Sequence, residues 1–229
     1  LRPQHFQQIL EKSQNTEHGE AVALMILRSQ SQAEYTPVNI GHFGLNIDRY
    51  SHFTSPIRRY SDLLVHRSLI TTLKLGDGGL PKAIAIDFPA IGTHLSQTER
   101  RATSAERNAM DRYRTSFLAD KLGAIFSSAI SGVTRFGLFI SLNESGAEGL
   151  IPIRHIGKQL GERVDYHAVS HTLNARQAGV SFSLGDDLSV RLETADPVNG
   201  SLIFSLSEFD SPDISQQPIK ARYRRGLKR

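Results

Sequence analysis

The hydrophobic pattern of the chain changes its period at Gly123. Before that residue, apolar side chains recur every three or four positions, which is typical of helices that bury one face. After it, apolar and polar residues alternate, with glycine-bearing turns between the runs, which is typical of short strands. Four or five such strands in about 85 residues favour a small closed barrel over a sandwich. The sequence therefore predicts an α+β chain, a mainly helical part followed by a five-stranded OB-fold β-barrel.

The first part of the chain carries three helical patterns. The first runs from Arg2 to about Arg28. The second begins at Ser55 and Pro56, because serine is a good N-cap and proline is preferred at the first helical position, and it continues to about Leu73. The third follows the break "GDGGLPKA" and has a densely charged outer face and a stripe of nearly heptad period. The stripe consists of Ile91, Leu95, Thr98, Ala102, Ala105, Ala109, Tyr113 and Phe117.

The strand-like part contains a hairpin and an insertion. Residues 186–209 read as two alternating runs joined by a turn that contains proline and Asn-Gly. Residues 154–178 interrupt the strands with a polar interval that we expect to be part helical. Within it, His167 and His171 could share one helical face as zinc ligands, but no third ligand accompanies them. A solvated loop or helix is the preferred interpretation, and we assign no metal site.

The composition restricts the class of protein. A chain of 229 residues can form one large or two modest domains. Cysteine is absent, which excludes a disulfide framework and a thiol nucleophile and fits a reducing compartment such as the cytoplasm, where we expect the protein to act. Separately, we expect it to be a monomer. No apolar run approaches the roughly 20 residues that span a bilayer, and we expect no membrane partner. Because the chain opens on Leu1 rather than methionine, we expect a fragment of something longer.

The net charge of +4 belongs to the C-terminal tail. Residues 209–229 hold six lysines and arginines against two aspartates, and the charges before them balance. A basic, disordered arm beside a barrel favours contacts with phosphates, although a tail that only aids solubility is the alternative. The arginines expected to make such contacts are Arg222, Arg224 and Arg225.

The stretch "SPIRRYSDLLVH" places cations at a helix start. If the helix begins at Pro56, its free N–H groups and the Arg58 guanidinium form a site for an anion. Arg58, Asp62 and His66 would share one stripe, and Arg59 would lie within reach of Asp62. Asp62 could then hold one arginine while the other stays free for a phosphate. The alternative is that both arginines are neutralised by nearby carboxylates, and spacing alone does not decide between the two.

A longer stretch around it, "HFGLNIDRYSHFTSPIRRYSDLLVHR", resembles the signature of the ribonuclease II/ribonuclease R (RNB) family, and the ribonuclease R branch most closely. The resemblance extends over nearly the whole chain. It implies that residues 1–122 are the C-terminal portion of an RNB catalytic domain, that residues 123–208 are an S1-type OB-fold RNA-binding domain, and that residues 209–229 are a basic tail. The implied activity is a processive, hydrolytic 3′-to-5′ exoribonuclease that degrades single-stranded RNA to nucleoside 5′-monophosphates.

The resemblance also implies roles for individual residues. Arg58 would press on the scissile phosphate, and Glu106 of the "AERN" element would help to clamp the terminal base. Phe136 and Phe139 of "TRFGLFISL" would face RNA, unless one of the two belongs to the barrel core, since residues three apart on a regular strand face opposite sides. The remaining signature residues would line the pocket for the RNA 3′ end: His52, Thr54, Ser55, Arg59 and Tyr60.

The family's magnesium ions are held by aspartates that precede the matched part. Asp48 and Asp62 do not reproduce that cluster, so we assign no metal ligand and expect the magnesium ligands upstream of this chain. Hydrolysis assisted by magnesium needs carboxylates that place the ions. We therefore expect this chain alone to be inactive. Two alternatives remain: a non-catalytic RNA-binding protein built on the same domains, and an interaction module whose arginines are neutralised internally.

Overall fold

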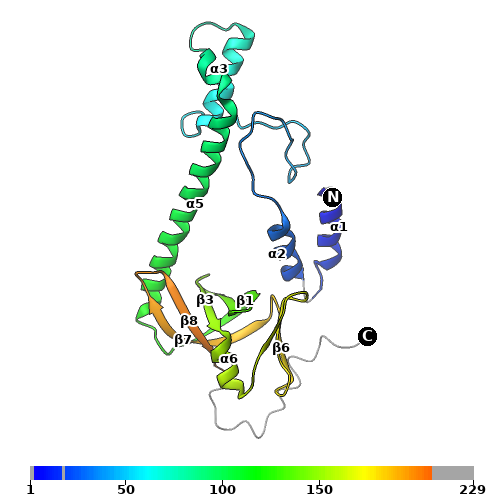
Figure 1. The fold of residues 1–229 in the computed structure, drawn as a ribbon, viewed down its shortest axis with the longest axis vertical. Coiled ribbons are helices and arrows are strands. Elements are labelled where there is room, and N and C mark those ends of the chain that lie inside the picture. Colours follow the sequence, from blue (N-terminus) through cyan, green and yellow to red (C-terminus); the bar gives the residue numbers. More distant parts are fainter. Residues whose placement is uncertain (1–2, 17–18, 208–229) are drawn as a thin grey trace. The chain divides into compact units, whose positions relative to one another are not determined.

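The structure is a computed structural model that describes residues 3–16 and 19–207. The chain divides into two compact units, Leu1–Ala105 and Glu106–Arg229. The first unit contains helices and a long irregular segment, residues 30–59, and a closed five-stranded barrel lies in the second (Figure 1). The predicted α+β class, helices followed by a five-stranded OB-fold-like barrel, is confirmed.

The prediction of one continuous helix from Arg2 to about Arg28 is wrong. Two helices, α1 (Pro3–Ser13) and α2 (Gly19–Ser29), lie side by side (Figure 1). A turn ends α1: the Thr16 N–H donates to the Ser13 carbonyl oxygen, and the Ser13 hydroxyl donates to the Leu10 carbonyl oxygen. Short polar side chains that bond to the backbone compete with helix continuation, which explains the interruption.

Three further helices begin in the first unit: α3 (Tyr60–Leu73), the short α4 (Lys82–Ile86) and α5 (Phe88–Ala119). Leu64 of α3 and Ser96 of α5 are buried. The predicted α5 stripe is wrong in its C-terminal half, where Ala102, Tyr113 and Phe117 are exposed while Thr115 and Leu118 are buried. A stripe is buried only where another element packs on it, and the described residues place none over this face.

The barrel has the strand order β1-β2-β3-β8-β7. Its strands are β1 (Ile125–Thr134), β2 (Gly137–Leu142), β3 (Glu148–Pro152), β7 (Asp187–Asp196) and β8 (Ser201–Leu206). Neighbours pair antiparallel except β3 and β8, and β7 and β8 form the predicted hairpin. Alternate side chains, among them Leu138, Ile140 and Phe204, fill the interior without exposure to solvent.

The insertion between β3 and β7 is helical only in its first part. Helix α6 (Ile153–Leu160) is followed by a three-stranded sheet of β4 (Asp165–His167), β5 (Thr172–Ala175) and β6 (Val180–Phe182). Its strands are three or four residues long, too short for alternation to be visible in the sequence. The helix and the sheet bury apolar residues in the same core as the barrel: Ile156, Leu173, Ala175, Val180 and Phe182.

Candidate nucleic-acid interface

Helix α3 begins at Tyr60, so the predicted start at Ser55 and Pro56 is wrong. Arg59 is the N-cap, with extended backbone angles of φ −121° and ψ 117°. The N–H groups of Arg58 and Arg59 donate to the Ser55 carbonyl oxygen at 3.2 and 3.0 Å, which closes a turn before the helix. These N–H groups are therefore not free to bind an anion, and Arg58 does not share a helical stripe with Asp62 and His66.

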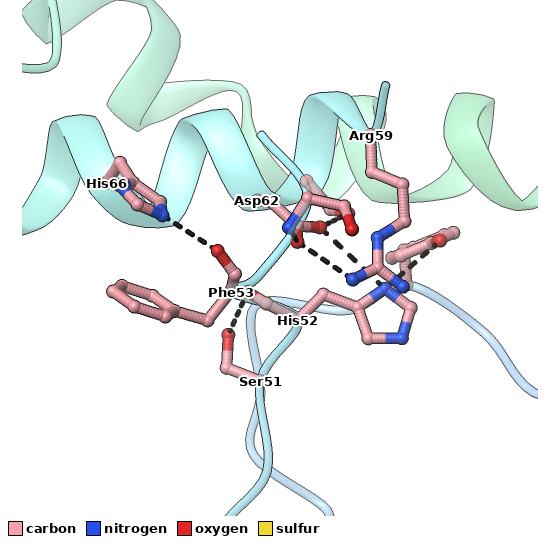
Figure 2. A network of polar contacts seen from close by, with 9 residues as sticks. Ser51, His52, Phe53, Arg59, Asp62 and His66 are labelled. Carbon is pink, nitrogen blue, oxygen red and sulfur yellow. Dashed lines mark hydrogen bonds and ion pairs between the residues drawn. The ribbon is translucent and has the colours of Figure 1, made fainter. Parts of the chain in front are cut away.

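Asp62, in the first turn of α3, holds this segment in place (Figure 2). Its carboxylate is inaccessible to solvent and accepts hydrogen bonds from the Ser55 N–H at 2.8 Å and the Arg59 Nη2 at 2.9 Å. The Ser61 hydroxyl donates to it at 3.2 Å, and His52 Nδ1 lies 4.0 Å away. A buried carboxylate needs such partners, because an unpaired charge in the interior is costly.

The partners of Asp62 also set its protonation. Burial raises the pKa of this carboxyl, but the Ser55 N–H, the Arg59 guanidinium and the Ser61 hydroxyl together hold the pKa below its ordinary value of 3.8. A carboxyl whose pKa is lower in the folded state stabilises the fold above the unfolded pKa. That stabilisation is lost as the pH falls through the folded pKa.

We therefore expect the stability advantage of the wild type over Asp62→Asn to be constant at pH 5–7, above the ordinary pKa of 3.8, and to shrink below it. Thermal unfolding of both proteins over that pH range, followed by circular dichroism, measures the difference. A pH-independent difference would contradict the assignment of the lowered pKa to Asp62.

His66 fixes the other end of the segment from the second turn of α3. Its Nε2 donates a hydrogen bond to the Phe53 carbonyl oxygen at 2.8 Å. The two rings stack, with centroids 4.3 Å apart and planes 12° from parallel (Figure 2). Residues 53–59 are therefore held to α3 at both ends, by His66 and by Asp62.

Arg58 is the cation that this arrangement leaves available. Its side chain is exposed, and no described residue pairs with its guanidinium, whereas Arg59 is only 29% exposed and is paired with Asp62. The hypothesis that Asp62 holds one arginine and leaves the other free is confirmed by this geometry. Thr54 and Tyr60 are also exposed beside it, while Ser55 is half-buried.

Tyr35 is part of this cluster, although sequence reasoning missed it. Its N–H donates to the Ser96 hydroxyl on α5 at 2.9 Å, and its hydroxyl lies 3.4 Å from His52 Nδ1. A Cβ on Gly92 would collide with the Tyr35 carbonyl oxygen, so only glycine allows this approach. Burial and the carboxylate of Glu99 raise the pKa of Tyr35 above its ordinary value of 10.0. No sequence signal links residues 61 positions apart.

The predicted aromatic residues lie on the barrel exterior, where Phe136 is 60% and Phe139 is 42% exposed. The alternative that one of them belongs to the core is wrong. Phe136 lies in the turn between β1 and β2, outside the strand, so the alternation of β2 does not apply to it. Phe139 pairs laterally with Leu150 of β3, which in turn pairs with Ile203 of β8. These partly exposed side chains form an apolar band across the three strands.

The other predicted residues are dispersed. Glu106 is exposed on α5 and belongs to the second unit, whereas the signature residues belong to the first. Arg222, Arg224 and Arg225 lie outside the described residues. The roles of all these residues stay predictions.

The described residues offer no metal centre. Within residues 3–16 and 19–207, no three histidine, aspartate or glutamate side chains gather closely enough to hold an ion. His167 ends strand β4 and His171 lies in the following turn with φ +49°, so the two do not share a helical face. None of the helices in these ranges combines the length and the apolarity that crossing a membrane requires.

Comparison with known proteins gives two domain matches. Residues 1–75 match the RNB domain, and residues 119–207 match the S1 RNA binding domain. Ribonuclease R of Aquifex aeolicus (strain VF5) is 35% identical over 206 residues, which cover 90% of this chain and 29% of that protein.

Solved structures of RNase R from Mycoplasma genitalium are also similar. The apo form has a TM-score of 0.78 at 30% identity, and the complex with ribose methylated single-stranded RNA has a TM-score of 0.77 at 28% identity. Each comparison covers 86% of this chain and 31% of the solved one. The fold and the matches define a helical RNB segment followed by an S1-type barrel. The chain belongs to the RNB family, in its ribonuclease R branch, and spans less than a third of the length of these relatives.

Proposed function

We propose that this chain contributes the RNA-contacting part of a processive, hydrolytic 3′-to-5′ exoribonuclease of the ribonuclease R type. In this proposal the substrate is single-stranded RNA, and the products are nucleoside 5′-monophosphates. The observation that carries it is the exposed Arg58, which pairs with no residue of the described part of the chain, beside an arginine that Asp62 neutralises. The names of the relatives support it, as does the RNA bound in the Mycoplasma genitalium complex.

In this proposal each residue acts through its own chemistry. Arg58 offers a permanently charged planar donor to the scissile phosphate, where it would stabilise developing charge. Asp62 and Arg59 position the turn that carries Arg58. The apolar band with Phe136 and Phe139 would stack on bases without sequence preference. Glu106 and the signature residues His52, Thr54, Ser55 and Tyr60 would contact the 3′-terminal nucleotides.

The proposed activity includes magnesium, but the described residues do not form a site for the ion. No three potential ligands lie close together among them. The magnesium ligands would lie in a part of the longer protein upstream of this chain. We further propose that the protein is a monomer and acts in the cytoplasm; the absence of cysteine fits the reducing environment of that compartment.

A non-catalytic RNA-binding protein is the second candidate, and the missing metal centre among the described residues favours it for this chain alone. A 5′-labelled single-stranded RNA, incubated with the chain and magnesium and followed by gel and by anisotropy, tests both. Salt-dependent binding with intact RNA is expected. A ladder of shortened RNA that is absent with Arg58→Ala would show that the chain is active alone. Failure to bind would refute both candidates.

The barrel aromatics give a further prediction. Phe136→Ala and Phe139→Ala should each weaken binding of a single-stranded RNA by about 1–3 kcal/mol, because each removes one stacking surface. Fluorescence anisotropy of the full chain with oligouridylate measures the affinity. Phe117→Ala is the matched control, since it removes an exposed ring from α5 rather than from the barrel. An equal loss in the control would contradict a specific role for the two barrel residues.

A further inference from the structure

The turn that carries Phe136 is joined directly to the start of α6. The Ile153 N–H, at the first residue of α6, donates to the Phe136 carbonyl oxygen at 2.9 Å. Gly137 pairs with Pro152, the N-cap of α6. Arg135 lies over the Phe136 ring, 4.8 Å from its centroid. The exposed aromatic residue, its stacked arginine and the beginning of α6 therefore meet at one end of the barrel.

Helix α6 turns two cations away from the core. Ile156 is fully buried, and Ile153 and Leu160 pack against the core. Arg154 and Lys158 are exposed, and their spacing of four places them on one face of the helix, about 6 Å apart along its axis. No described residue forms an ion pair with either cation.

The carboxylate nearest to Lys158 in the sequence is already engaged. Glu162 follows the C-terminus of α6 and accepts hydrogen bonds from the backbone N–H groups of Gln177 and Ala178. Its carboxylate is therefore engaged in the turn between β5 and β6. Among residues 3–16 and 19–207, no carboxylate forms an ion pair with Arg154 or Lys158.

The charge of the barrel unit makes this end distinctive. Residues 106–207 contain ten lysines and arginines against eleven aspartates and glutamates, so this part of the chain is not basic as a whole. The two segments that meet at the α6 end, residues 131–142 and 149–161, contain no acidic residue. They carry three cations, Arg135, Arg154 and Lys158. A positive region therefore adjoins the aromatic residue, whereas the rest of residues 106–207 holds seven lysines and arginines against eleven aspartates and glutamates.

We propose that Arg154 and Lys158 on α6, continued by Arg135, bind consecutive phosphates of a single-stranded RNA whose bases stack on Phe136 and Phe139. This inference rests on the proposed function and extends the RNA path from the strands of the barrel onto its helix. Aromatic platforms combined with a line of cations bind single strands without sequence preference. Phosphate contacts of this kind fix the position of the strand and carry no sequence information.

The salt dependence of RNA binding tests the proposal. The full chain, the double variant Arg154→Gln/Lys158→Gln and a control are titrated with fluorescent oligouridylate at several salt concentrations. The control is Arg163→Gln/Arg176→Gln, which removes the same charge from residues that are 92% and 76% exposed but share Asp165, at 3.6 and 3.8 Å. Loss of two phosphate contacts should reduce the slope of log K against log salt by about 1.4 for the α6 variant. The control should keep the slope of the wild type.

The outcomes separate the inference from the function on which it rests. An unchanged slope in the α6 variant, or an equal change in the control, would overturn the inference while RNA binding itself stands. A wild type that binds no RNA would overturn the proposed function together with the inference. Thermal unfolding of the variants serves as the control for folding, because exposed charges contribute little to stability.

Discussion

Replacing Asp62 with alanine is expected to lower the free energy of unfolding of the helical unit by about 3 kcal/mol. The substitution leaves the Arg59 guanidinium without its partner and the Ser55 N–H without an acceptor. Removing one member of a buried pair costs more than the pair contributes, because the remaining charge stays partly desolvated. The value lies at the lower end of the usual range because Arg59 is 29% exposed.

Urea unfolding of the full chain, followed by the helical circular dichroism signal, measures this loss. Asp77→Ala is the matched control, since Asp77 is exposed in the loop after α3 and no described residue pairs with its carboxylate. The control should stay within about 0.5 kcal/mol of the wild type. If Asp62→Ala cost no more than the control, the carboxylate would not be what holds residues 53–59 in place.

Replacing Gly137 with alanine is expected to destabilise the barrel by a similar amount, about 3 kcal/mol. Gly137 has φ +143°, a region that other residues rarely adopt, and a Cβ there would collide with the Ile151 carbonyl oxygen and the Ile153 nitrogen. The strain of the backbone and the collision add, and the collision falls on the pairing between β2 and β3.

Gly179→Ala separates these two contributions. Gly179 also has a positive φ, +65°, but no atom lies within 4 Å of the position of its Cβ. The control should therefore lose about 1–2 kcal/mol from backbone strain alone. Denaturant unfolding of both variants provides the comparison. Equal losses would mean that the close approach at Gly137 is relieved by a small shift of β3.

Local patterns predicted much of the fold because they follow from short-range geometry. Alternating side chains identified the barrel strands, since a strand with one face on the core must alternate. The spacing of Arg59 and Asp62 predicted their pairing, since residues three apart on a helical turn are neighbours, and the structure places Arg59 Nη2 2.9 Å from the carboxylate. The signature around Arg58 predicted the family, which the matches to the RNB and S1 domains confirm.

Long-range contacts decided what local patterns could not. Helix α3 begins at Tyr60 and not at the predicted Pro56. The reason is that the Ser55 carbonyl oxygen closes a turn and the Ser55 N–H donates to Asp62, seven residues away. Similarly, Tyr35 belongs to the site only because of contacts with α5. Gly92 leaves room for the Tyr35 carbonyl oxygen, and the Ser96 hydroxyl accepts a hydrogen bond from the Tyr35 N–H. Propensity favours a helix at Ser-Pro, but the bonds to a buried carboxylate outweigh that preference.

The sequence by itself determined the helical and strand-like halves and the family, and it placed Arg59 within reach of Asp62. Only the tertiary structure decided that Arg58 is exposed, that Phe136 and Phe139 both face outward, and that α6 begins beside the Phe136 turn and leaves Arg154 and Lys158 exposed. The physical reason is that periodicity depends on the few residues of one turn or strand. Exposure depends on which distant elements pack over a side chain.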